Sequence, residues 1–304
     1  MTVDVTLPSA EQLPEVLLEL AVPHEDIDEL VARRPGPELW PLLEHYTGIV
    51  VGGMGEIDLP APPDPLPDEL GELRRYFPVY ILLAALPHVR AYHHSRGIPA
   101  RVSWLTLTDL GRAMARHRRR HGTGGLELLS WLVLHFRGAL YQLGRLQFQR
   151  ARLNEVLGRA VAAAGLPYGP GDYALNIHIP GASGPLSPAA CDASLRAAAG
   201  FFARHFAEER PAVATCHSWL LDGQLAGYLP AESNILRFQR RFHVVEVPQD
   251  HGDDEILRHV FVRVPDDLDD LPRTTTLERA IVDHLRTGGH WYGVSGWLPL
   301  DGAR

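Results

Sequence analysis

Residues 173–205 constrain the fold more than any other stretch of the chain. They open with YALNIHIP, an apolar and partly alternating segment that predicts a strand ending near a histidine. After a loop of glycine, proline and other small residues, Ser187 as N-cap and Pro188 at the first helical position begin an amphipathic helix over 187–209. A helix N-terminus concentrates unpaired backbone N–H groups and partial positive charge, so this order of elements suits phosphate oxygens.

The chain changes character near GTGG, Gly122–Gly125. Before it, apolar residues recur with helical spacing in several segments. The five prolines of IDLPAPPDPLPDEL (57–70) interrupt them, which excludes regular structure there and predicts a stiff connector. After it, strand and helix patterns alternate. We therefore predict a helical domain over 1–127 and a mixed α/β domain over 128–304.

The second part contains a specific order of elements. From residue 140 onward it is strand, strand, helix, strand, helix, strand, strand, and a further helix and strand close the chain. The strands are predicted at 143–151, 173–180, 211–222, 243–249, 259–265 and 291–300. The helices between them are predicted at 187–209, 230–242 and 275–289.

That order resembles the GNAT acyltransferase fold, whose central strand leads into a loop and helix that hold the coenzyme A pyrophosphate. The segments LGRLQFQ, NIHIPGASGPLS, CHSWLLD and LPAESNILRFQRRF are similar to those of a bacterial acyltransferase-domain family. Its members join an N-acyltransferase-type helical N-terminal domain to a GNAT-like C-terminal domain. The resemblance implies an α/β (α+β) fold with a mixed sheet. It also implies acyl transfer from acyl-CoA, or from a carrier-bound thioester, to the amine of a small molecule or peptide.

The coenzyme A contacts implied by the resemblance lie in the loop and in a later helix. The loop residues are Ile179, Gly181, Ala182, Ser183 and Gly184. Small residues let backbone amides approach a pyrophosphate closely. The loop lacks the basic residue usual in GNAT proteins, and Pro185 removes one donor, so an ordinary strand-to-helix turn is the alternative. The amide of Asn234 bonds the pantetheine arm or caps its helix.

Three residues are candidates for the chemistry. His178 is the predicted general base, because it lies near the end of the central strand and histidine titrates near neutral pH. Strand alternation places Cys216 and Ser218 on one face and His217 on the other. If that strand neighbours the His178 strand, Cys216 or Ser218 could face His178 and support an acyl-enzyme or a proton relay. The alternative is a buried histidine and a core cysteine.

One usual group is missing. GNAT enzymes often use a tyrosine as the acid for the leaving thiolate, but the corresponding aromatic here is Phe238, and nothing places Tyr141 or Tyr292 there instead. A non-catalytic acyl-thioester-binding or scaffold protein is therefore the alternative function. A thioester hydrolase that uses Cys216 or Ser218 is a third.

Composition and charge exclude other classes. The net charge of −8 argues against nucleic acid as the main partner. The sequence contains no apolar run of about 18 residues, so we expect no membrane span. It contains only two cysteines, which indicates a reducing cytoplasm. In HRRRH, His117 and His121 have metal-ligand spacing, but three intervening arginines favour a solvated basic helix end, so no metal is predicted. That end could also contact an adenosine phosphate or the acidic surface of an acyl carrier protein.

Overall fold

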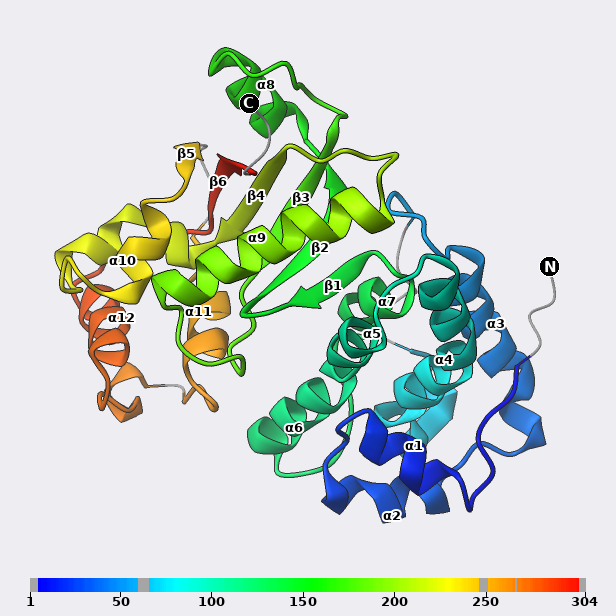
Figure 1. Cartoon of the computed structure of the whole chain (residues 1–304). Coiled ribbons are helices and arrows are strands. Elements are labelled where there is room, and N and C mark those ends of the chain that lie inside the picture. Colours follow the sequence, from blue (N-terminus) through cyan, green and yellow to red (C-terminus); the bar gives the residue numbers. More distant parts are fainter. Residues whose placement is uncertain (1–4, 60–65, 246–250, 266, 301–304) are drawn as a thin grey trace. The chain divides into compact units, whose positions relative to one another are not determined.

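The computed structural model describes residues 5–59, 66–245, 251–265 and 267–300 (Figure 1). The chain divides into two compact units, Met1–Gln142 and Leu143–Arg304. The first is helical and the second is a mixed α/β unit, so the predicted fold class is confirmed. Among the described residues, no helix combines the length and apolar character that a membrane span requires.

The first unit packs its helices around α4. The α-helices are α1 (Leu13–Glu19), α2 (His24–Ala32), α3 (Trp40–Gly52), α4 (Phe77–Ser95), α5 (Ala100–Leu107), α6 (Asp109–His121) and α7 (Leu129–Phe136). All of the first ten residues of α4, 77–86, are buried, which is the pattern of a helix that is apolar all round and lies in a core. Its neighbours include α3, α5 and α7.

The predicted boundary at 127/128 and the structural division at 142/143 differ. Helix α7 begins at Leu129, and its buried residues, among them Leu132 and Phe136, join the same core as α4. The helical unit therefore continues past the glycine-rich turn. In the predicted connector, residues 60–65 lie outside the described residues. The exclusion of regular structure there is wrong at its end, because 3₁₀ turns begin at Asp68 and run to Arg75.

The strands form a six-stranded mixed sheet in the order β1-β2-β3-β4-β6-β5, in which β1 spans the division at 142/143 and the other five strands belong to the second unit. They are β1 (Leu140–Leu143), β2 (Leu146–Arg152), β3 (Tyr173–His178), β4 (Val213–Ser218), β5 (His243–Val245) and β6 (Val294–Pro299). Strands β3 and β4 are parallel, whereas β2 is antiparallel to β3 and β6 is antiparallel to both β4 and β5. The C-terminal strand β6 thus lies inside the sheet.

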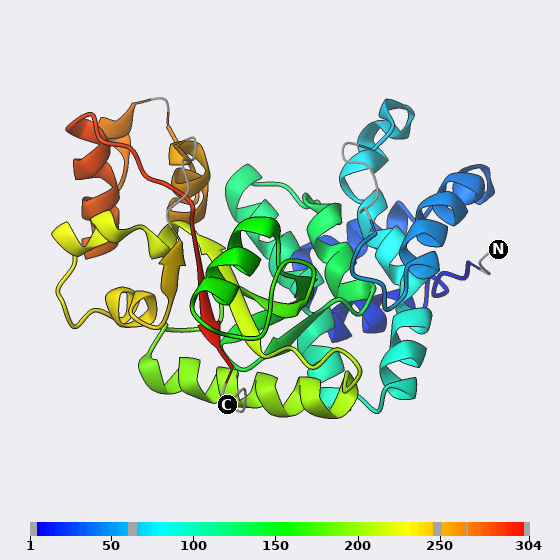
Figure 2. The same ribbon diagram turned by 90° about the horizontal axis from the view of Figure 1, so that it is seen from above.

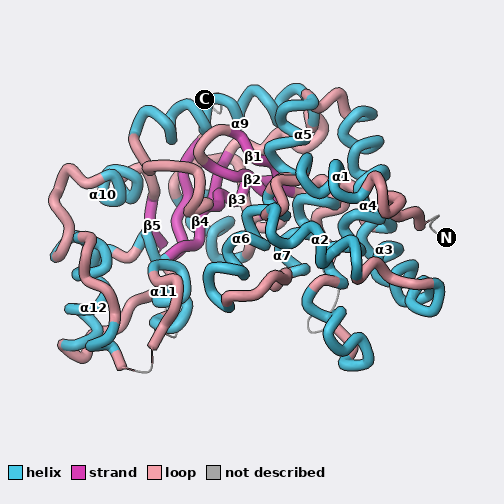
Figure 3. Tube along the Cα trace, turned by 90° about the horizontal axis from the view of Figure 1, so that it is seen from below, coloured by secondary structure: helices cyan, strands magenta, loops and turns pink. Residues whose placement is uncertain are grey.

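Helices cover both faces of this sheet. They are α8 (Glu155–Ala163), α9 (Pro188–His205), α10 (Asn234–Gln239), α11 (Asp253–Val260) and α12 (Thr276–Arg286). Helix α9 lies along one face (Figure 2 and Figure 3). On that face Arg150 of β2, opposite Leu175 of β3, stacks on Phe206 just after α9. Helix α8 packs on the other face against Ala174 and Val213.

Two elements differ from the sequence prediction. The predicted strand at 259–265 is wrong: α11 reaches Val260 and buries Ile256 and Leu257, and the following Val262 and Val264 are exposed. The alternation of apolar residues here predicted a strand, but this segment does not pack against the sheet. Helix α8, which Asn154 caps through a bond from the Leu157 amide, was not predicted.

Candidate functional site

The central strands β3 and β4 stop pairing before their carboxyl ends. Among the described residues these parallel neighbours pair at two positions, Leu175 with Ala214 and Asn176 with Thr215. Both strands continue beyond these pairs, β3 to His178 and β4 to Ser218. The ladder therefore ends before either strand does, at their carboxyl ends, which is where open α/β sheets bind ligands.

One face of the sheet is polar at this end. The strand registers place a set of polar side chains on it: Gln147, Gln149, Asn176, His178, Thr215, His217 and Ser295. His178 Nε2 donates to Gln149 Oε1 over 2.8 Å, which leaves the lone pair of the neutral ring on Nδ1. Thr215 Oγ1 donates to Asn176 Oδ1 over 3.4 Å. These bonds orient polar groups beside the point where the strands stop pairing.

Sequence reasoning missed a second histidine on this face. His217 Nδ1 lies 2.9 Å from Ser295 Oγ of β6, and its side chain is exposed. It was noticed only as the neighbour of Cys216 that points the other way. The alternation within β4 contained the signal, but the parallel pairing that puts His217 on the face of His178 is a long-range feature.

The predicted meeting of Cys216 or Ser218 with His178 is wrong. Since Thr215 is opposite Asn176, Cys216 points to the face of Ile177, away from His178. Cys216 is 1% exposed, and burial raises the pKa of its thiol to about 12. Such a thiol is protonated at neutral pH and is a core residue rather than a nucleophile. Ser218 Oγ accepts from the Leu220 amide and begins a 3₁₀ turn.

The loop between β3 and α9 carries the predicted coenzyme contacts. Gly181, Ala182 and Gly184 are exposed, and Gly184 has φ +80°, a conformation that favours glycine. A Cβ added at Gly181 or Gly184 would meet no other atom within 4 Å. Ser187 caps α9 as predicted, its Oγ accepting from the Ala190 amide. The loop therefore presents open backbone next to a helix N-terminus.

Two arginines from other segments lie near the start of α9. Arg241, just before β5, bonds Asp192 near the start of α9 over 2.5 Å and also donates to the Pro188 carbonyl. This guanidinium lowers the pKa of Asp192. Arg145, in the turn before β2, lies close enough to act electrostatically on Cys191 in the same turn of α9, as does Arg241. Burial still raises the pKa of the Cys191 thiol.

The remaining predicted residues lie as follows. Asn234 is the exposed first residue of α10, and the cap is Ser233, whose Oγ accepts from the Leu236 amide, so the capping alternative for Asn234 is wrong. Phe238 is buried in the same helix. Tyr141 belongs to the first unit, where its hydroxyl donates to the Gly138 carbonyl.

Comparisons with known proteins agree with this arrangement. A model of the N-acyltransferase N-terminal domain matches residues 11–138, and a model of the GNAT-like C-terminal domain matches 140–298. The chain belongs to this acyltransferase family. Solved structures similar to the acyltransferase include one in complex with decanoyl-CoA and teicoplanin, at 41% identity and a TM-score of 0.88. Another is in complex with CoA and 10C-teicoplanin, at 40% identity and the same TM-score.

In both comparisons the match covers 97% of this acyltransferase and 90% of the solved chain. A further similar structure, at 42% identity, is in complex with decanoyl-CoA. Among curated proteins no match was found. The boundary between the two family domains lies close to the division between the structural units.

Proposed function

We propose that this enzyme transfers a fatty acyl group from acyl-CoA to an amine. The observation that carries the proposal is the likeness, over 97% of the chain, to acyltransferases in complex with decanoyl-CoA and with teicoplanin. The acceptor in this proposal is an amine-bearing small molecule or peptide, for example a glycopeptide such as teicoplanin. A carrier-bound acyl thioester is the alternative donor.

Coenzyme A binds the loop after β3 in this proposal. The amides of Ile179, Gly181, Ala182, Ser183 and Gly184 face the pyrophosphate, since a glycine-rich turn and a helix N-terminus favour anions. Arg241 and Arg145 beside the first turn of α9 support this placement, because guanidinium groups pair well with phosphate. The exposed amide of Asn234 bonds the pantetheine arm.

The thioester carbonyl lies at the carboxyl ends of β3 and β4. The acceptor nitrogen attacks the carbonyl carbon, a C–N bond forms and the C–S bond breaks. The amine proton passes to His178 Nδ1, the basic nitrogen left by the Gln149 bond, and then to the departing thiolate sulfur. Gln149 is a positioning residue in this scheme, and Ser218 has no part in bond making because its hydroxyl caps a turn.

Phe238 keeps a second candidate function in view. Phe238 has no hydroxyl, so it cannot supply the acid that an acyltransferase needs for the leaving thiolate. A non-catalytic protein that only binds acyl thioesters needs no such acid, so this residue is compatible with it. The two functions differ in whether CoA is released in proportion to acylated acceptor.

The test uses the full chain with decanoyl-CoA and teicoplanin. A thiol reagent follows released CoA, and mass spectrometry follows the acceptor. The proposal expects one acyl group added per CoA released, and no reaction with teicoplanin whose amines have been acetylated. Decanoyl-CoA binding without turnover on any amine would favour the scaffold function. Turnover with an acyl carrier protein thioester alone would reassign the donor.

A further inference from the structure

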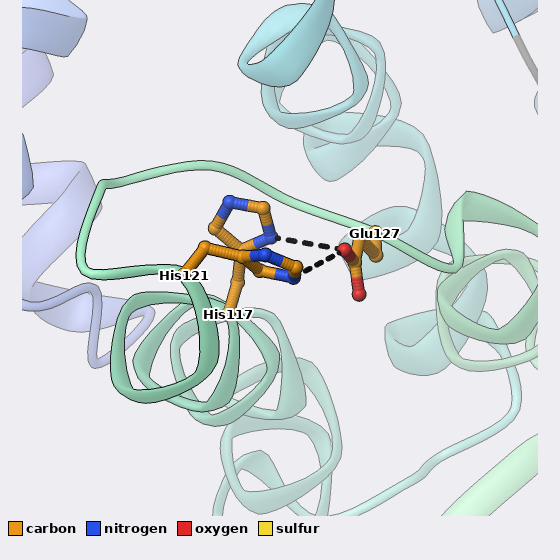
Figure 4. Close-up of side chains that lie close together, drawn as sticks. All are labelled: His117, His121 and Glu127. Carbon is orange, nitrogen blue, oxygen red and sulfur yellow. Dashed lines mark ion pairs between the residues drawn. The ribbon is translucent and has the colours of Figure 1, made fainter. Parts of the chain in front are cut away.

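Two histidines and a carboxylate converge at the C-terminal end of α6 (Figure 4). His121 Nε2 lies 2.7 Å from Glu127 Oε1, and His117 Nδ1 lies 3.6 Å from the same oxygen. The ligand atoms all lie within 4.8 Å of one another. From the sequence these histidines were interpreted as part of a solvated basic helix end, because three arginines lie between them. Glu127, which completes the cluster, comes from the next loop.

The backbone after α6 turns so that Glu127 lies next to the two histidines. Helix α6 ends at His121 and is followed by Gly122, whose φ of +73° only a few residue types accept without cost. The chain then passes close over His117, since a Cβ at Gly125 would stand 2.6 Å from His117 Nε2. A side chain at Gly125 would push the ring away, so this glycine fixes where the imidazole lies.

One buried ring nitrogen of His117 suggests that a ligand binds here. Its Nδ1 is buried and has no hydrogen-bond partner among the described residues, although it points toward Glu127. Buried polar atoms are normally satisfied, so an orphan nitrogen facing a carboxylate needs an explanation.

Three of the neighbouring arginines already have a carboxylate partner. Arg118 binds Asp26, and Arg75 binds Glu29. Arg120 approaches the other carboxylate oxygen of Glu127, Oε2, at 3.7 Å. Arg119 is exposed to solvent. Of the three arginines in HRRRH, only Arg120 therefore reaches Glu127, and it does so at Oε2 and leaves Oε1 facing the histidines. In that position Arg120 orients the carboxylate as an outer partner does in metal sites.

We propose that His117, His121 and Glu127 bind a divalent transition-metal ion of the Zn²⁺ type. Neighbouring ligands of a tetrahedral zinc ion stand about 3.4 Å apart, given bonds of about 2.1 Å. The observed separations of 2.7 and 3.6 Å from Glu127 Oε1 lie on either side of that value. His117 and Glu127 also line a pocket of about 580 Å³, which lets water supply a fourth ligand.

The ion would connect the end of α6 to the loop that leads into α7. This role is independent of acyl transfer, and its test needs no substrate. A metal-free chain is titrated with Zn²⁺ by calorimetry and with Co²⁺ by visible absorption. We expect about one ion per chain, with the intense d–d bands of a tetrahedral site. Zn²⁺ should also raise the melting temperature, because an ion that binds the folded chain stabilises it.

Two variants locate the ion. His121 and Glu127 are both partly exposed, so His121→Asn and Glu127→Gln should fold, which circular dichroism checks. Each should weaken Zn²⁺ binding at least about tenfold and abolish the Co²⁺ bands. The matched control is His290→Asn, which alters another cluster, His251, Asp253 and His290. Binding that survives in both variants, binding lost only in the control, or no binding by the folded wild-type chain would each overturn the proposal.

Discussion

His178 Nε2 and Gln149 Oε1 lie 2.8 Å apart across neighbouring strands, and this bond decides which imidazole nitrogen is basic. A histidine held in that tautomer presents Nδ1 as the proton acceptor. In the proposed mechanism His178 is the base and Gln149 is the group that orients it, and substitutions can separate these two roles.

Loss of the base should reduce turnover without reducing thioester binding. We expect His178→Ala and His178→Gln to lower kcat by roughly 10²–10⁴-fold, the usual contribution of a general base, because neither side chain can take up the proton. Stopped-flow kinetics and calorimetry with decanoyl-CoA measure the two quantities. Gln149→Leu should lower kcat less, and Gln149→Glu should restore part of it. Full turnover in His178→Ala would reassign this histidine to packing.

The glycine-rich loop should tolerate no bulk at the pyrophosphate. Gly181→Val and Gly184→Val both extend into open space in the free protein, and only Gly184 has a positive φ. Both should weaken CoA binding sterically, whereas only Gly184→Val should lower the melting temperature noticeably. Unchanged CoA affinity in Gly181→Val, measured by calorimetry, would move the coenzyme away from this loop.

Arg241 should contribute to coenzyme binding, and its neighbour should not. Arg241→Gln removes a charge at the first turn of α9 and should weaken CoA binding roughly tenfold, the scale of a lost charge-assisted bond. Arg240→Gln is the control, because Arg240 is exposed and bonds only the Ala231 carbonyl among the described contacts. Equal affinities in the two variants would leave Arg241 with a purely structural role beside Asp192.

The thiol of Cys216 should be dispensable. Because burial raises its pKa to about 12, it stays protonated at neutral pH and has the character of a core atom. Cys216→Ala should therefore keep kcat within a few-fold of the wild type. In the native protein, iodoacetamide should label Cys216 only after denaturation. A trapped acyl group on this cysteine, detected by mass spectrometry, would contradict the register of β3 and β4.

The first unit should lose stability as pH falls. Burial lowers the pKa of His93 to about 4, and its Nδ1 lies 2.7 Å from Ser103 Oγ. The unfolded chain then binds a proton that the folded chain excludes, so stability is complete above about pH 6.5 and declines toward pH 4. The decline amounts to roughly 3 kcal/mol for this group. His93→Gln should flatten that part of the pH profile in urea unfolding, and an unchanged slope would assign it to other groups.

Several local signals were read correctly from the sequence, although the alternation at 259–265 was not, and long-range features were missed. Ser187 and Pro188 define the start of α9 because capping depends on adjacent residues. Alternation separated Cys216 from His217 correctly, but the face on which each lies relative to His178 depends on pairing between strands far apart in the chain. Arg241 reaches α9 for the same reason, through contacts that no spacing in the sequence predicts.

The position of β6 has a consequence for how the protein is made. Residues 294–299 pair with β4 on one side and with β5 on the other, although they are synthesised after both. On the ribosome, the edge of β4 therefore stays without its partner strand until almost the whole second unit has been translated. An open edge of this kind attracts other strands, and such late pairing is slow. A nascent chain stalled before residue 294 should thus be a preferred client of chaperones that shield unpaired strands.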